Sequence, residues 1–196
     1  IYTLSLHDAL PISIVALEIS CARTSDGVWI ANHDNNLKSL GGPDKNIAQM
    51  TWADVQAAMA AMPEKMPCRL DWLLEIYGNS TVIVFDPKNS NRFRDEFFGI
   101  LEPYKPRIAI KFFGDLFSLF DDARARGFKS WGYAYESSKT AAWWKEYASG
   151  QHIDIFSMTW NASKETYDEL KATGKPIVSH ITSWTNHAQA AAALGA

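Results

Sequence analysis

Two pairs of polar side chains stand two residues apart beside apolar runs. Glu18 and Ser20 follow IVAL, and Asp86 and Lys88 follow TVIVF. Residues two apart point to the same side of a β-strand, so each pair should share one face. A carboxylate in such a run is costly to bury unless a divalent cation or a basic side chain compensates it. Two hypotheses stay open: Glu18 and Asp86 are metal ligands, or they are structural carboxylates paired with a base such as Lys88 or Arg23.

A histidine and an aspartate, His33-Asp34, come directly after the run VWIAN. Imidazole is the side chain best suited to proton transfer near neutral pH. His33 is therefore a candidate general acid or base. The alternative is a histidine that is merely exposed in a polar loop.

The elements that must position these residues are short strands alternating with helices. Asp26-Gly27, between the first two strands, is a strong hairpin signal. Thr51 is a predicted helix N-cap, and Gly127 and Gly174 are predicted helix ends. The predicted strands are 14–20, 28–32, 81–85, 107–113, 129–135, 154–159 and 176–181. Predicted helices follow Thr51 and occupy 69–77, 91–101, 115–126, 138–149, 163–172 and 184–195.

This alternation favours parallel β/α packing, which a doubly wound sheet and an eight-fold barrel both satisfy. No glycine-rich nucleotide-binding turn opens a predicted helix, which disfavours nucleotide-binding folds. A complete barrel usually needs about 250 residues, and this chain has 196.

Composition narrows the class of protein. The chain has 19 basic and 22 acidic residues and is 47% hydrophobic, which is typical of a folded domain. It has no Lys/Arg run that would indicate a nucleic-acid partner and no apolar stretch of the roughly 20 residues that a transmembrane helix needs. Cys21 and Cys68 lack zinc spacing; we interpret them as buried free thiols, with a disulfide as the alternative.

The stretch LEISCARTSDGVWIANHDNNL, residues 17–37, resembles the metal-binding and hairpin segment of the glycerophosphodiester phosphodiesterases, in which Glu-x-Asp is followed by Thr, Asp-Gly, an apolar strand and His-Asp. MPCRLDWLLEIYG and TVIVFDPK are similar to the family's Pro-x-x-Leu-x-x-x-Leu helix and Ile-Glu-x-Lys strand. The resemblance implies an α/β fold, the (β/α)8 TIM barrel. It also implies a metal-dependent phosphoric diester hydrolase of lipid metabolism, which converts a glycerophosphodiester and water to an alcohol and glycerol 3-phosphate.

The resemblance implies a role for each candidate residue. Glu18 and Asp86 would be metal ligands of a divalent cation, Ca²⁺ or Mg²⁺. Lys88 would offset phosphate charge, and His33 would protonate the leaving alkoxide. Asp86 replaces a glutamate that is one methylene longer, and Ser20 replaces the second carboxylate of Glu-x-Asp. We therefore expect weaker cation binding than in the family.

Both ends of the chain depart from the family. We interpret residues 1–13, IYTLSLHDALPIS, as a non-native, adapter-like segment, which leaves 14–196 as a partial barrel domain. The family's His-Arg-Gly motif has no counterpart before residue 14, and the chain stops at LGA, where the family continues into an eighth strand. We expect a barrel incomplete at both ends and a chain that is inactive as given.

Two other functions stay open. One is a non-catalytic barrel that binds a phosphoester or sugar phosphate, which Ser20 and the absent histidine favour. The other is a structural or interaction domain whose tryptophan-rich surface, including Trp143, Trp144 and Trp160, contacts carbohydrate or protein, against the alternative that these residues pack inside. In the first two cases the partner is a small molecule. A cytoplasmic and an exported location, and any oligomeric state, are compatible with the sequence.

Overall fold

The computed structural model describes residues 16–88, 90–112, 117–134, 140–149 and 153–180, with 189, 192 and 193. The chain divides into two compact units, the first ending at Ile108 and the second beginning at Ala109. The segment 1–13 lies outside the described residues, as does most of the predicted helix 184–195. Each unit is described separately below.

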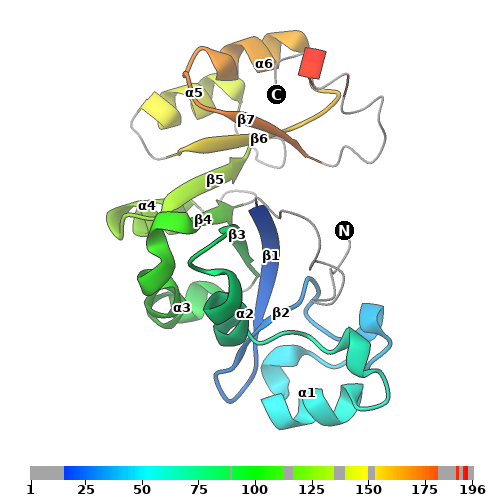
Figure 1. Ribbon diagram of the computed structural model, residues 1–196. Helices are drawn as coiled ribbons and strands as arrows, with labels where there is room; N and C mark the ends of the chain where they lie inside the picture. Colours follow the sequence, from blue (N-terminus) through cyan, green and yellow to red (C-terminus); the bar gives the residue numbers. More distant parts are fainter. Residues whose placement is uncertain are drawn as a thin grey trace. The chain divides into compact units, whose positions relative to one another are not determined.

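The first unit contains a hairpin and a parallel strand (Figure 1). Its strands are β1 (Ala16–Arg23), β2 (Trp29–Ala31) and β3 (Val82–Pro87), in the order β2-β1-β3. β1 is antiparallel to β2 and parallel to β3. The turn between β1 and β2 contains Gly27 at φ 91°, a conformation that glycine adopts without strain. The hairpin predicted from Asp26-Gly27 is confirmed.

Two strand ends were predicted too early: β3 continues beyond Phe85 to Pro87, as β1 does beyond Ser20. β1 continues beyond the predicted end at Ser20 to Arg23, because Cys21, Ala22 and Arg23 pair with β2. Glu18 and Ser20 therefore lie inside a strand and not at its end.

The first two helices of this unit begin where the sequence places helix starts, whereas α3 begins at Arg94, three residues after the predicted start, because Ser90–Phe93 forms a 3-10 turn. Thr51 caps α1 through a capping box, in which its side chain accepts from the Asp54 amide and its own amide donates to the Asp54 carboxylate. The helices are α1 (Trp52–Met59), α2 (Leu70–Tyr77) and α3 (Arg94–Leu101). Short 3-10 turns at 38–40, 47–49, 63–65, 90–93 and 102–107 connect the elements.

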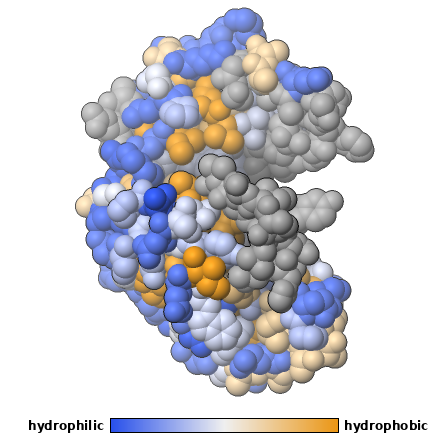
Figure 2. All heavy atoms as spheres, in the orientation of Figure 1, coloured by the Kyte–Doolittle hydropathy of each residue, from blue (hydrophilic) through white to orange (hydrophobic). Residues whose placement is uncertain are grey.

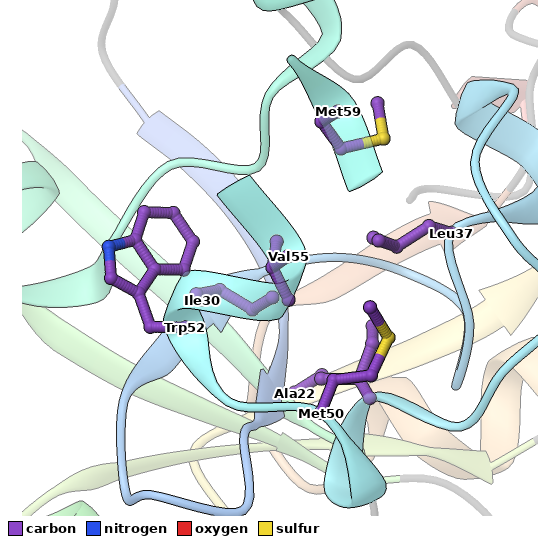
Figure 3. Packing of buried hydrophobic residues seen from close by; sticks show 8 residues of the cluster. Ala22, Ile30, Leu37, Met50, Trp52, Val55 and Met59 are labelled. Atoms are coloured by element: carbon purple, nitrogen blue, oxygen red, sulfur yellow. The ribbon is translucent and has the colours of Figure 1, made fainter. Parts of the chain in front are cut away.

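Two apolar clusters hold this unit together. Phe85 of β3 packs edge-on against Phe97 of α3, so this face of the sheet is covered by a helix. The second cluster lies between the hairpin and α1 (Figure 3), and its buried members are Ala22, Ile30, Leu37, Ile47, Met50, Trp52, Val55 and Met59. This second cluster fixes the loop that follows β2, which carries His33.

The second unit is a parallel sheet with helices between its strands. Its strands are β4 (Ile108–Phe112), β5 (Lys129–Tyr133), β6 (Ile155–Thr159) and β7 (Ile177–His180), paired in this order and all parallel. The helices are α4 (Phe117–Ala125), α5 (Ala141–Ser149) and α6 (Lys164–Lys171). Gly127 and Gly174 have φ of 80° and 71°, as expected after a helix end. The parallel packing predicted from the alternation is confirmed.

Two expectations about single residues can now be compared with the structure. Trp144 is 1% exposed and packs edge-on against Phe156 of β6, which confirms the alternative that it packs inside and is not part of a surface. Cys21 is buried as expected, but Cys68 is only half-buried; both are free thiols. On the face drawn in Figure 2, hydrophilic residues cover most of the coloured surface and apolar residues form small patches.

The fold class is α/β. Mostly parallel strands alternate with helices as in a (β/α)8 barrel, and the described residues contain seven strands, one of them the antiparallel arm β2. Among the described strands, the order begins at β2 and ends at β7. Within the described ranges, no helix combines the length and the apolar character that crossing a membrane requires.

Candidate functional site

The strand register of the first unit aligns three polar residues. Ser20 of β1 is the Cα partner of Asp86 of β3. On the other side of β1, the Asn32 amide donates to the Ser20 carbonyl at 2.9 Å. Paired positions on adjacent strands point to the same face, so Glu18, Ser20 and Asp86 share the face opposite Phe85. The prediction that Glu18 and Ser20 lie on one face of a strand is thus confirmed.

Glu18 and Asp86 occupy diagonal positions on this face. Glu18 pairs with Val84, two residues before Asp86. Diagonal neighbours of this kind have Cα atoms about 7–8 Å apart. Glu18 is exposed, whereas Asp86 is buried. Two carboxylates on such a diagonal can both reach one cation, whose oxygen ligands lie about 2.0–2.6 Å from it.

The buried carboxylate of Asp86 has a basic partner on its own strand end. The Lys88 Nζ lies 2.8 Å from the Asp86 Oδ2, and the Lys88 amide donates to the Asp86 carbonyl at 3.0 Å. Asp86 is 2% exposed, so this ion pair offsets much of the cost of burying its charge. The sequence left Lys88 open as a structural partner of Asp86, and the structure contains that pair. Arg23, the other suggested partner, bonds Glu96 instead.

The loop after β2 holds His33 beside this face. The buried side chain of Asn32 donates from Nδ2 to the Asp34 carbonyl at 2.6 Å and to the Asn36 carbonyl at 3.0 Å. His33 itself is exposed, and its Nδ1 lies 2.9 Å from the Asp34 Oδ1. The Asn32 amide also donates to the Ser20 carbonyl. His33 is the next residue along the chain, so it follows the sheet directly beside the paired residues Ser20 and Asp86.

The electrostatics connect these groups. Hydrogen bonding from Ser39, then from His33, lowers the pKa of Asp34, and the positive charge of Lys88 adds to the shift. Burial raises the pKa of the Cys21 thiol well above its usual value, and the negative charges of Asp86 and Glu18 add to it. Cys21 is thus a neutral thiol, a poor nucleophile and a poor metal ligand.

The donor set is suited to a hard cation. Glu18, Ser20 and Asp86 offer oxygen ligands, which Ca²⁺ and Mg²⁺ prefer. Within the described part of the chain, no group of three or more His, Cys, Asp or Glu side chains is arranged to hold a metal ion. Mg²⁺ commonly uses one or two carboxylates, completed by water and substrate phosphate. A cation site at Glu18 and Asp86 therefore stays a prediction, and Lys88 would compete with such a cation for Asp86.

Sequence reasoning missed the residues that hold the hairpin in place. Glu96 of α3 accepts from Arg23 at Nε and Nη2, each at 2.8 Å, and from the Trp29 Nε1 at 2.6 Å. Hydrogen bonding from Arg23 lowers the pKa of Glu96. This network fixes β1 and β2 against α3. Asn32 was also missed, although a buried asparagine at a strand end is a residue type that often organises a loop.

The fold is that of the glycerophosphodiester phosphodiesterase barrels. Solved structures share it over most of this chain at 11–18% sequence identity. At such low sequence identity the likeness establishes the fold alone. For the fold, it confirms the family resemblance that was found in the sequence. No protein-family model and no curated protein matches the sequence.

Three of these structures illustrate the likeness. A protein from Agrobacterium tumefaciens described as a glycerophosphoryl diester phosphodiesterase has a TM-score of 0.72 and 18% identity over 94% of this chain and 80% of its own. The glycerophosphodiester phosphodiesterase of Thermotoga maritima has a TM-score of 0.70 and 18% identity; the match covers 88% of this chain and 75% of that protein. An Oleispira antarctica phosphodiesterase, solved with the product sn-glycerol 3-phosphate, has a TM-score of 0.70 and 15% identity; the match covers 93% of this chain and 79% of that protein.

Proposed function

We propose that this protein is a metal-dependent phosphodiester hydrolase of the glycerophosphodiester phosphodiesterase type. The observation that carries the proposal is the shared barrel fold, with a TM-score of 0.72 over 94% of the chain. The row of Ser20 and Asp86, with Lys88 and the His33 loop beside it, supports it further. The substrate would be a small glycerophosphodiester, cleaved to an alcohol and glycerol 3-phosphate.

Each residue of the site has a chemical task in this proposal. Lys88 places a positive charge beside the phosphodiester and stabilises negative charge that develops on its oxygens. His33 gives a proton to the oxygen of the departing alcohol, and Asp34 keeps the imidazole oriented through its contact with Nδ1. Asn32 keeps the loop of His33 in place through its bonds to two backbone carbonyls.

Glu18 and Asp86 are the proposed ligands of a divalent cation, Ca²⁺ or Mg²⁺, with Ser20 as a neutral third donor. Such a cation, when bound, polarises a phosphoryl oxygen as a Lewis acid. A hydroxyl in place of a carboxylate removes one negative charge from the donor set, which lowers cation affinity. We accordingly expect turnover by the 196-residue chain to be below detection.

The alternative function is a non-catalytic barrel that binds a phosphoester or a sugar phosphate. The observation that favours it is Ser20, which stands directly beside Asp86 and supplies no charge. Both functions predict binding of a phosphoester near Lys88, and only the first predicts cleavage.

Calorimetric titration with sn-glycerol 3-phosphate in the presence of Ca²⁺ tests what the two functions share. We expect binding that weakens about tenfold or more in Lys88→Met, because a hydrogen bond to a charged group contributes roughly 1.5–3 kcal/mol. Lys105→Met is the matched control, since Lys105 lies in the same unit and pairs with Glu102. Equal binding by both variants and the unchanged chain would argue against a phosphoester site at Lys88.

A gain-of-function variant separates the two functions. Ser20→Asp restores a second carboxylate beside Asp86 and should tighten Ca²⁺ binding. Because this variant restores only one of the site residues in which the chain departs from the family, we expect slow release of glycerol 3-phosphate from glycerophosphocholine if the protein is a hydrolase, and adding His33→Ala should reduce that release about 10²- to 10⁴-fold. Release that His33→Ala leaves unchanged, or tighter Ca²⁺ binding with no release, would count against the hydrolase.

A further inference from the structure

Two large apolar side chains are exposed on one face of α2. Trp72 is 50% exposed and Ile76 is 57% exposed. Residues four apart are neighbours on the surface of a helix. The core face of α2 is a different one, since Leu70, Leu73 and Leu74 are buried. Trp72 and Ile76 therefore form an apolar strip, the Trp72 strip, on the outer face of α2.

Opposite charges lie on the two sides of the Trp72 strip. Arg69 precedes Trp72 by three residues, and its guanidinium carbon lies 5.0 Å from the centroid of a Trp72 ring. Glu75 follows Trp72 by three residues and is exposed. Because a helix has about 3.6 residues per turn, positions three before and three after Trp72 lie about 60° to either side of it. The strip therefore has a basic side and an acidic side.

This arrangement is complementary to itself. Two copies of α2 can pack antiparallel about a two-fold axis that passes through Trp72. The rotation reverses the direction of the helix and exchanges its two sides. Arg69 of each copy then faces Glu75 of the other copy, and the two Trp72 side chains meet at the axis. One register thus buries the apolar strip and forms the same ion pair twice.

The guanidinium of Arg69 is able to bind a second carboxylate. Its Nε and Nη2 donate to the Asp71 carboxylate. A guanidinium has five N–H donors, so Nη1 can donate to Glu75 of another copy.

A membrane is a poorer partner for the Trp72 strip. Helices that lie on membranes carry Lys and Arg beside their apolar face. α2 instead carries the exposed acidic residues Asp71 and Glu75 beside its strip. The negative surface of an anionic membrane would repel both carboxylates. The charges therefore favour a second copy of this chain over a lipid surface.

We propose that the Trp72 strip, with Arg69 and Glu75 at its sides, is the contact surface of a two-fold symmetric dimer of this chain. α2 has eight residues and is about 12 Å long. It supplies only part of the roughly 800 Å² per partner of a standard interface, so the dimer is weak and reversible. The proposal uses no residue of the proposed phosphodiesterase site and is independent of that function.

Sedimentation velocity of the full chain tests the dimer. The sedimentation coefficient should rise from the monomer to the dimer value between about 10 µM and about 1 mM, the range in which a weak complex dissociates. Trp72→Ala should raise the dissociation constant about tenfold or more, because central aromatic residues commonly dominate an interface. Val178→Ala is the control: Val178 is also exposed, at 39%, but lies on β7 in the second unit, so dimerisation should stay unchanged.

An exchange of charges tests the register. Arg69→Glu and Glu75→Arg should each weaken the dimer about tenfold or more, because like charges then face each other twice. An equal mixture of the two variants should dimerise as well as the unchanged chain. In the mixed dimer, the glutamate introduced at position 69 faces the arginine introduced at position 75, and the unchanged Arg69 and Glu75 face each other. Glu165→Arg, at an exposed position of α6, is the control and should dimerise normally.

Three results would overturn the proposal. They are a monomer over the whole concentration range, equal association of the unchanged chain and Trp72→Ala, and a mixture that associates no better than either charge variant alone. If Arg69→Glu does not fold by circular dichroism, Trp72→Ala and Glu75→Arg decide. A chain that stays monomeric but sediments with phosphatidylglycerol vesicles, and no longer does so in Trp72→Ala, would assign the strip to a lipid surface and also overturn the dimer.

Discussion

The ammonium of Lys88 lies 2.8 Å from the carboxylate of Asp86, and the carboxylate is 2% exposed. The two residues are separated by a single proline at the end of β3. A buried carboxylate of this kind needs positive charge beside it, and Lys88 supplies such a charge. The relationship makes the stability of the first unit sensitive to Lys88.

Lys88→Met should destabilise the protein by about 3 kcal/mol, because removing one member of a buried pair leaves the other charge uncompensated. Urea denaturation at pH 7 measures the change. The double variant Lys88→Met/Asp86→Asn should recover part of the loss, since it removes both charges. Unchanged stability in Lys88→Met would show that the pair is not buried as described.

The Glu96 network should make stability depend on pH. The bond from Arg23 lowers the pKa of Glu96 in the folded state. A lowered pKa contributes stability above the unfolded value of about 4.3, and this contribution is lost as the pH falls through the lower, folded value. At pH 7, Glu96→Gln should therefore be about 1 kcal/mol less stable than the unchanged chain.

Thermal unfolding between pH 7 and pH 3 measures this difference, which should shrink as the solution becomes acidic. Asp44→Asn is the control, because Asp44 pairs with Lys38 at the surface, where such pairs contribute little. A gap between Glu96→Gln and the unchanged chain that widens in acid would contradict the assignment.

Asn32→Ala removes two bonds from a buried amide to loop carbonyls. We expect a loss of about 1–3 kcal/mol in the free energy of unfolding, with a change in the NMR signals of the His33 ring. Asn36→Ala is the matched control in the same loop, because its half-buried side chain bonds the Asp44 carboxylate and the Lys38 amide and not the carbonyls that Asn32 binds. Equal effects of the two variants would exclude a special role for Asn32.

Asp26 connects the hairpin turn to α1. Its carboxylate accepts from the Trp52 amide at 3.0 Å and from the Thr24 hydroxyl at 2.6 Å. Asp26→Ala should cost about 1–2 kcal/mol, the usual effect of losing a helix cap. Guanidinium denaturation measures it, with Ser25→Ala in the same turn as control. No loss would mean that the Thr51 capping box alone secures the start of α1.

Local rules predicted most of the elements. The Asp26-Gly27 turn, the Thr51 cap and the helix-end glycines each depend on residues within a few positions of one another. The spacing of two between Glu18 and Ser20 was enough to place that pair on one face, whereas Lys88 follows the end of β3 and contacts Asp86 through its side chain. The role of His33 came from the family resemblance and remains a prediction.

Contacts between distant residues were beyond local rules. Arg23 and Glu96 are 73 positions apart, and only the packing of α3 beside the hairpin brings them together. Asp26 and Trp52 are separated by 26 positions, so a residue chosen for its turn propensity also caps a helix. The burial of Lys111 could not be predicted from the sequence around it, because the residues beside it, Trp131 and Tyr133, lie on a neighbouring strand.

The central claim is that Glu18 and Asp86 hold one divalent cation. Calorimetric titration with Ca²⁺ tests it directly on the full chain and on Glu18→Gln, Asp86→Asn and the control Asp71→Asn, whose residue pairs with Arg69. We predict one weak site whose dissociation constant rises about tenfold or more in each of the first two variants and stays unchanged in the third. Folded Glu18→Gln and Asp86→Asn proteins that bind Ca²⁺ as well as the unchanged chain would contradict the account.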